Sequence, residues 1–520
     1  MKSGTVLPAL VLFSAVAFAQ SLNVPWSGYA HDPQHSALSA AAAQPLNNIH
    51  WSTTVGLNAP GGSGALYTHY GSLSVTAGNT VLVPVTTGLG AFEVLAYNGA
   101  TGALIYTLPS DYTLPPHGWT PPYTPALSLG TRLYYAGAGG TVYYRDTLNG
   151  PNGSNGQPGA TGQYVFYGKS VYTANQAALN AAIQISTPIT ADRYGDIFFG
   201  FVAAAGNGAG PGGSDLISGL ARIGPTGTGT WVSAKSLAGN DPSVAQVSLN
   251  CAPALSNNQL TVYVAVSGGG TFDTNGYLVS ANATTLAPVA HTQLFDPRGS
   301  RATVSSDSSA APMVGPDGDV YYGVLENPCC SSHNDRGWML HYNSTLSTLK
   351  TPGSFGWDNT ASVVPASIVP SYTGTSSYLI LTKYNNYIGI GSGTGVNQVG
   401  VLDPNGTMTD EYCPSSCSST PVTVMSEVIT VTGVTSQATE YYPNAVNEWC
   451  INTTVIDPFT NAAIVNSEDG VVYRWDFPSN SLLQRLRLTS GRGEAYTPTA
   501  VGPDGTVYAI NDAILFAVGN

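Results

Sequence analysis

The sequence predicts an all-β fold in which small antiparallel sheets repeat around a closed ring, a β-propeller. The first observation behind this prediction is a short pattern that recurs along the 520 residues. A small residue, a proline and apolar residues are followed by a polar turn and an apolar–aromatic strand. Copies begin at Tyr123, Ser186, Cys251, Ala311 and Tyr496. Repetition on this scale indicates one supersecondary unit used many times.

Composition is the second observation. The chain holds 60 glycines and 30 tyrosines, and charged residues make up 9% of it, against the roughly 25% of a typical domain. This mixture favours strands and tight turns over long helices.

The third observation is that further strands follow each copy and end in Asn, Asp or Gly turns, as in segments 94–102, 277–285 and 399–406. Each unit is therefore expected to be one blade of about four strands. Eight first strands are expected, with seven blades as the alternative count; they start near Leu73, Thr124, Thr187, Ala252, Ala311, Val363, Asn452 and Thr497. The long interval after Val363 is interpreted as one blade with an insertion.

The two ends of the chain are expected to close the ring. The last unit ends one strand early, after the strand that begins at Ala513. Segment 46–54 reads as the missing outer strand, and closure of this kind removes exposed strand edges. We therefore expect a single propeller domain over residues 20–520.

The first 19 residues have the pattern of a secretory signal peptide. Lys2 precedes a short apolar run that ends in an Ala-x-Ala site at Ala19. The predicted location is secreted or periplasmic, with cleavage after Ala19. No apolar run is long enough to predict a membrane span.

The net charge of the chain limits the kinds of molecule that it is expected to bind. The chain carries a formal charge of −13 and has no basic stripe, which argues against nucleic acid. A small molecule, a glycan or a protein remains as a candidate partner, and the oligomeric state is open.

Six cysteines in an exported chain are expected to be oxidised. Cys413 and Cys417 bracket a short turn and are candidates to close a small loop. Cys329 and Cys330 are adjacent, which suggests a vicinal disulfide. Six cysteines permit fifteen connectivities, so the pairing stays open.

Two segments resemble the pyrroloquinoline-quinone-like (PQQ-like) propeller repeats. Residues 95–102, Leu-Ala-Tyr-Asn-Gly-Ala-Thr-Gly, are similar to that family's blade motif, and residues 26–36 with 46–51 are similar to its N-terminus. The resemblance implies an eight-bladed propeller. The family includes quinoprotein dehydrogenases and scaffolds that bind no quinone, so fold does not settle function. His31, Asp32 and His35 of this N-terminal motif are expected to satisfy polar groups beside the closing strand.

The same resemblance bears on a cofactor. Segment 329–337 looks like the Cys-Cys and Arg-Gly pattern of the dehydrogenases, which implies that Cys329, Cys330 and Arg336 lie beside a quinone paired with calcium. The sequence departs from the pattern in three ways. The cysteine pair lies in the fifth unit, the spacing to Arg-Gly differs by one residue, and the calcium-ligand and catalytic-aspartate motifs have no match at corresponding places. Catalytic residues therefore stay unassigned.

The candidate binding face follows from propeller topology, because loops that enter the innermost strands gather on one face. Those loops hold many of the few charges, and loops between second and third strands should share the face. The candidate polar residues at the channel mouth are Asp307, Asp358, Glu448, Arg492, Glu494 and Lys383. Asp307, Asp358 and Glu494 are candidate calcium ligands, since calcium takes oxygen donors; the competing interpretation is that each caps a turn.

The sequence thus predicts an exported PQQ-like propeller that binds a ligand or partner on its loop-rich face. Two alternatives remain: a quinoprotein-type oxidoreductase with PQQ and calcium, and a carbohydrate-binding or carbohydrate-active protein.

Overall fold

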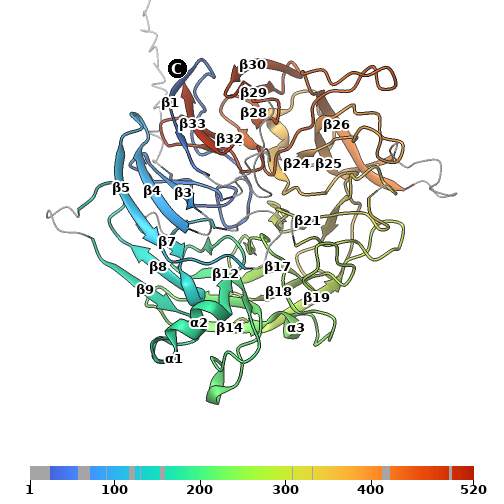
Figure 1. The fold of residues 1–520 in the computed structure, drawn as a ribbon. Helices are drawn as coiled ribbons and strands as arrows, with labels where there is room; N and C mark the ends of the chain where they lie inside the picture. Colours follow the sequence, from blue (N-terminus) through green and yellow to red (C-terminus); the bar gives the residue numbers. More distant parts are fainter. Residues whose placement is uncertain are drawn as a thin grey trace, which may run out of the picture.

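The computed structural model describes residues 24–56, 71–88, 91–115, 123–128, 131–152, 159–306, 308–330, 332–410, 412, 422–490 and 495–520. Within these ranges the strands form eight antiparallel sheets, which follow one another around a ring in chain order (Figure 1). The eight-bladed count is therefore confirmed over the alternative of seven.

The sheets are numbered here as blades 1 to 8, each beginning at its innermost strand. Blade 1 contains β2 (Ser74–Val75), β3 (Thr80–Gly88), β4 (Ala91–Asn98) and β5 (Leu104–Ser110). Blade 2 contains β6 (Ala126–Ser128), β7 (Arg132–Ala136), β8 (Thr141–Arg145) and β9 (Thr161–Val165). Blade 3 contains β10 (Ile183–Ile185), β11 (Thr190–Ala191), β12 (Ile197–Ala203), β13 (Gly219–Ile223) and β14 (Gly229–Ser233). Blade 4 contains β15 (Gln246–Val247), β16 (Ala254–Leu255), β17 (Thr261–Ser267), β18 (Tyr277–Asn282) and β19 (Pro288–Gln293).

The second half of the ring is less regular. Blade 5 contains β20 (Met313–Val314), β21 (Val320–Val324) and β22 (Trp338–Tyr342). Blade 6 contains β23 (Ser362–Pro365), β24 (Tyr378–Lys383), β25 (Gln398–Thr409) and β26 (Thr423–Thr432). Blade 7 contains β27 (Val455–Asp457), β28 (Ala462–Asn466), β29 (Val471–Asp476) and β30 (Ser481–Arg487). Blade 8 contains β31 (Ala500–Val501), β32 (Val507–Asn511), β33 (Ile514–Gly519) and β1 (Asn48–Thr54).

Each copy of the proline pattern leads into the innermost strand of a blade, as predicted. The strand beyond it is almost wholly buried, as in β12, where Ile197, Phe198 and Phe199 are inaccessible to solvent. Apolar residues on both faces of such a strand fill the space between neighbouring blades.

The predicted ring closure is confirmed. The N-terminal strand β1 pairs antiparallel with β33, from Asn48 opposite Gly519 to Thr54 opposite Ile514. In Figure 1 the blue β1 lies directly beside the red β33 at the top of the ring. This pairing covers the outer edge of β33, and β1 becomes the outermost strand of blade 8.

Helices are few and short in the described part of the chain. The α-helices are α1 (Lys169–Ala174), α2 (Gln176–Ala182) and α3 (Ala234–Leu237), and the 3-10 turns are Ala138–Gly140, Pro211–Gly213 and Ala366–Ile368. No described helix is long and apolar enough to cross a membrane.

Blade 5 departs from the predicted four strands, because its described sheet has three. The long β25–β26 hairpin of blade 6 reaches over its outer edge, where the Met425 N–H donates to the Pro352 carbonyl at 2.8 Å. Val422 and Val424 of this hairpin pack in the same apolar cluster as Trp338. The insertion predicted after Val363 thus covers the neighbouring blade.

The N-terminal segment 26–39 crosses the central channel, which the sequence did not predict. Its carbonyls accept backbone N–H groups from the innermost strands of blades 2, 4, 5, 6 and 7, and Trp26 bridges Val75 in blade 1. The accepting residues are Ser27, Pro33, Gln34, Ser36 and Ala37. We call segment 26–39 the channel plug.

The prediction that His31, Asp32 and His35 lie beside the closing strand is therefore wrong. They belong to the plug, and the His35 Nδ1 atom lies 2.7 Å from the Pro312 carbonyl at the innermost strand of blade 5. Burial lowers the pKa of His35 to about 4, so the ring is neutral. The error arose because backbone pairing across the ring leaves no periodic signal in the plug's side chains.

Candidate functional site

The candidate site lies on the loop face, defined as the face that carries the loops entering the innermost strands and the loops between second and third strands. Hydrogen bonds join these loops across blades. The Gly356 N–H donates to the Arg336 carbonyl at 2.9 Å, and Asn385 and Trp449 exchange two hydrogen bonds. The topology therefore places both loop types together, as predicted, over blades 5 to 7.

The loop between β21 and β22 is folded around one buried carboxylate. Glu326 is inaccessible to solvent, and its two oxygens accept the backbone N–H groups of His333, Asp335 and Gly337. Three charge-assisted hydrogen bonds fix the loop without any regular secondary structure. We call segment 326–337 the cysteine loop.

The cysteine loop brings Cys329 and Cys330 next to Asp335. The two sulfur atoms are within bonding distance of each other, and each lies within 4.8 Å of an Asp335 carboxylate oxygen. All three side chains are partly exposed. The cysteine pair predicted to lie at the loop face is thus on that face, with a carboxylate as its neighbour.

His333 of the cysteine loop forms a buried network with Ser354 and Asp410. His333 Nε2 lies 2.9 Å from Asp410 Oδ2, its Nδ1 lies 3.0 Å from the Gly337 carbonyl, and Ser354 Oγ donates to Asp410 Oδ1 at 2.6 Å. Burial tends to raise the pKa of Asp410, but the hydrogen bonds from His333 and Ser354 outweigh it and lower this pKa. Ser354 Oγ also lies 3.4 Å from His333 Nε2, but its shorter hydrogen bond goes to the aspartate, and all three side chains are buried away from solvent. We therefore interpret the network as a structural link between the cysteine loop and the β25–β26 hairpin.

Arg336, a predicted quinone contact, is fully buried beneath the loops. Its guanidinium donates to the carbonyls of Ser354 and Asn385 and lies 3.6 Å from the centre of the Tyr412 ring and 4.5 Å from that of Tyr384. Cation–π contacts and carbonyl acceptors of this kind stabilise a buried arginine. The Arg336 side chain is thus surrounded by other residues of the protein.

Asp358 and Lys383, two of the predicted channel-mouth residues, lie together. The Lys383 ammonium is 4.0 Å from Asp358 Oδ2, and both side chains are buried. Asp358 also accepts the backbone N–H and the hydroxyl of Ser309, at 2.6 and 2.7 Å. This carboxylate is therefore occupied by protein donors.

A second acidic group lies on blade 7. Glu448, from the loop entering β27, and Glu468, from the turn between β28 and β29, flank the thiol of Cys450. The Cys450 Sγ atom lies 3.1 Å from Glu468 Oε2 and 3.7 Å from Glu448 Oε2. Of these, the sequence predicted Glu448 alone as a site residue. Glu468 lies in a loop type expected on this face, so its position was the available signal.

Asp335 and Tyr387 link the two groups electrostatically. Burial, followed by the negative charges of Glu326 and Glu448, raises the pKa of Asp335 to about 7. Burial and the charges of Glu448, Cys450 and Asp335 raise the pKa of Tyr387 well above its ordinary value. We call the set Cys329, Cys330, Asp335, Tyr387, Glu448, Cys450 and Glu468 the loop-face cluster.

Five predicted residues lie outside the described residues: Asp307, Arg492, Glu494, Cys413 and Cys417. The roles predicted for them, including calcium ligation by Asp307 and Glu494, stay predictions.

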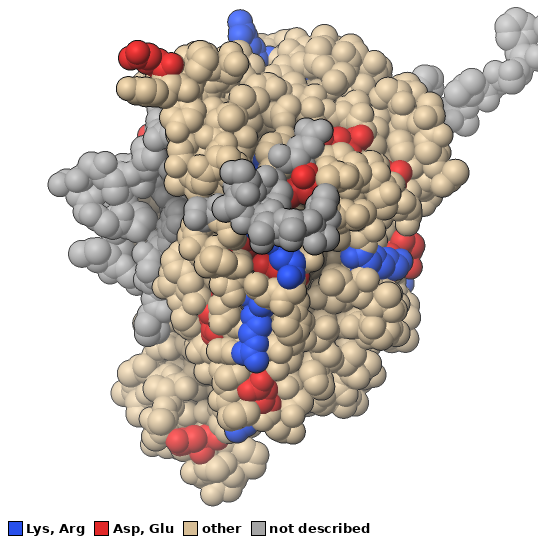
Figure 2. Space-filling view, turned by 90° about the vertical axis from the view of Figure 1, so that its right-hand side faces the viewer, with Lys and Arg blue, Asp and Glu red and all other residues tan. Residues whose placement is uncertain are grey.

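Charged side chains are sparse on the surface of the ring. On the side shown in Figure 2, they form small separate groups on a largely uncharged surface.

Comparison with solved structures places the ring among known propellers. A europium-containing methanol dehydrogenase superposes with a TM-score of 0.54 at 9% identity, over 94% of this chain and 89% of that one. The quinohemoprotein alcohol dehydrogenase from Comamonas testosteroni gives a TM-score of 0.50 at 11% identity, over 95% and 77%. The chain has the fold of the quinoprotein dehydrogenases. No family model matches the sequence, and no curated protein matches it.

Sequence identity this low shows a shared fold and nothing about the cofactor. Whether a quinone and calcium could bind must be judged from the residues of the loop face. PQQ carries several carboxylates, and the charged groups around Asp335 are Glu326, Glu448 and Lys383. Lys383 already pairs with Asp358. The described residues therefore present excess negative charge to an anionic quinone, and we assign no step to it. The Cys450 thiol, a soft donor, also suits calcium poorly.

Proposed function

We propose that the protein is an exported propeller that binds a cationic ligand at the loop-face cluster. The observation that supports this most directly is that the carboxylates of Glu448 and Glu468 flank the Cys450 thiol on blade 7. Asp335 of blade 5 lies close enough for the charge of Glu448 to raise its pKa. Neighbouring negative charges repel one another, and a cation bound between them relieves this repulsion. Export itself rests on the signal-peptide pattern.

The chemistry of the donors narrows the ligand. Two carboxylates and a thiol are a mixed set, which favours a divalent metal of borderline softness such as zinc over calcium. The partial exposure of Asp335 and Glu448 leaves one side of the set accessible from the loop face. A larger ligand that carries a positive group would meet the same donors.

Isothermal titration calorimetry of the purified mature chain with zinc and with calcium tests this proposal. We expect zinc to bind more tightly than calcium, and Glu468→Gln to weaken zinc binding by about tenfold or more. Binding should also strengthen as pH rises through 7, because Asp335 then loses its proton.

The matched control is Asp476→Asn, a partly buried carboxylate at the far end of blade 7 whose neighbour is Ser479. It should leave binding unchanged. Absence of zinc and calcium binding, or equal affinity in Glu468→Gln and wild type, would contradict the proposal. A bound-quinone absorbance on addition of PQQ with calcium would instead favour the oxidoreductase alternative.

A further inference from the structure

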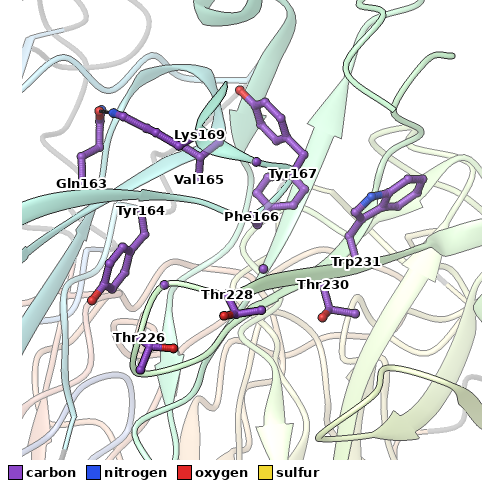
Figure 3. Close-up of a pocket in the computed structure, with 13 residues that line it drawn as sticks. Gln163, Tyr164, Val165, Phe166, Tyr167, Lys169, Thr226, Thr228, Thr230 and Trp231 are labelled. Carbon is purple, nitrogen blue, oxygen red and sulfur yellow. Dashed lines mark hydrogen bonds between the residues drawn. The ribbon is translucent and has the colours of Figure 1, made fainter. Parts of the chain in front are cut away.

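A groove with a cavity volume of about 600 Å³ lies on the rim of the ring, between blades 2 and 3. Its walls are the end of β9 with the residues after it, and β14 with the turn before it (Figure 3). Both strands are the last of their sheets, so each presents one unpaired edge. The loop-face cluster belongs to blades 5 to 7, and the groove is therefore independent of the proposed function.

Two glycines let the blades approach closely at this groove. A Cβ atom at Gly227 would lie 2.6 Å from the Tyr164 ring, and one at Gly229 would lie 2.0 Å from the Phe166 carbonyl oxygen. Side chains at either position would push the two walls apart. The local sequence thus sets the width of the groove.

The aromatic walls are held in place by their own hydroxyls. The Tyr164 hydroxyl accepts from Arg132 at 3.1 Å and donates to the Pro225 carbonyl at 3.2 Å, and the Tyr167 hydroxyl donates to the Gly139 carbonyl at 2.7 Å. Trp231 is partly exposed at the other end of the groove. Rings fixed in this way lose little entropy when a ligand stacks on them.

Threonines supply the polar side of the groove. Thr226, Thr228 and Thr230 alternate along the chain, and Figure 3 shows them in a row between Tyr164 and Trp231. Among the described residues, none of their hydroxyls has a hydrogen-bond partner, and neither does the Trp231 indole N–H. These groups are therefore available to a ligand.

The groove is almost free of charge. Lys169 is the charged side chain in its lining, and its ammonium donates to Gln163 Oε1 at 2.9 Å. Hydroxyl and indole donors beside fixed aromatic rings suit a ligand that has both apolar C–H faces and hydroxyl groups. We propose that this groove binds a neutral oligosaccharide.

The experiment is calorimetric titration of the whole mature protein with four soluble probes: cellohexaose, maltohexaose, laminarihexaose and chitohexaose. At least one should bind. Trp231→Ala should weaken that binding by about tenfold, and Thr228→Val, which replaces a hydroxyl by a methyl group of similar size, by several-fold. Leu483→Ala, on the exposed outer strand of blade 7, is the control and should bind as wild type.

Thermal melting of each variant checks that the ring is intact. Weakened binding in both groove variants, with melting temperatures near that of wild type, supports the proposal. Failure of all four probes to bind, or wild-type affinity in both groove variants, overturns it. An extended peptide that pairs with the edge of β9 or β14 is the competing occupant; tight peptide binding that survives Thr228→Val also overturns the proposal.

Discussion

Burial and the charges of neighbouring carboxylates explain the raised pKa of Asp335. It lies at a left-handed backbone position (φ 61°) in the cysteine loop, it is partly buried, and its carboxylate faces Glu326 and Glu448. Its neighbours in sequence are Asn334 and Arg336, which reveal none of this. The shift is a property of the loops that meet there.

Asp335→Asn should stabilise the protein at alkaline pH. The folded pKa of about 7 lies above the roughly 3.9 of an unfolded aspartate, so between these values the folded state holds more protons and stability falls as pH rises. Asparagine removes this loss and tolerates the left-handed backbone. We expect a gain on the order of 1–2 kcal/mol at pH 8, after allowance for solvent screening, and almost none near pH 4.

Urea denaturation at the two pH values, in metal-free buffer, measures this difference. Asp476→Asn serves again as the control. A gain of equal size at both pH values would show that the charge of Asp335 is not its cause.

At the scale of elements, the β25–β26 hairpin determines how the candidate site is built. It extends from blade 6 across the three-stranded blade 5, and Asp410 at the end of β25 meets His333 of the cysteine loop. Trp338 stacks on the face of the His333 ring, with the ring centres 3.7 Å apart. The buried network of His333, Ser354 and Asp410 therefore couples the β25–β26 hairpin of blade 6 to the cysteine loop of blade 5.

Asp410→Asn should destabilise the protein by about 2 kcal/mol, because one amide oxygen replaces the two carboxylate oxygens that face His333 and Ser354, and a buried polar group then loses its hydrogen-bond acceptor. The effect should be larger on the cysteine loop than on distant blades. Denaturant unfolding with hydrogen exchange of segment 326–337 measures both, and Thr407→Ala, exposed on the same hairpin, is the control. Wild-type exchange in this segment would refute the coupling.

For the whole molecule, the channel plug ties blades together at the centre while β1 ties them at the rim. The Tyr29 hydroxyl donates to the Ser309 carbonyl at 2.8 Å, contacts the Thr360 hydroxyl at 2.8 Å and accepts from Asn452 at 2.6 Å. These residues precede the innermost strands of blades 5, 6 and 7. One side chain thus connects the three blades that carry the loop-face cluster.

Tyr29→Phe should lower the free energy of unfolding by about 2 kcal/mol, since it leaves buried hydrogen-bonding groups without a partner while it preserves the ring's packing. Denaturant titration measures the change. Tyr441→Phe, whose side chain is 83% exposed, should have no effect. Equal stability of the Tyr29 variant and wild type would show that the plug is not held through this hydroxyl.

The sequence by itself determined the propeller fold, the positions of the innermost strands and the closure by segment 46–54, because these depend on repeated local patterns of apolar residues and turns. It favoured eight blades over seven, and the structure decided the count. It also placed Asp358, Lys383, Glu448 and the cysteine pair on the loop face, since propeller topology alone assigns those loops to one side. The tertiary structure decided the rest: the plug in the channel, the hairpin over blade 5, and the neighbours of Asp335 and Cys450. Those contacts join residues from different blades through backbone groups and single side chains, and a contact between distant segments leaves no periodic signal in either of them.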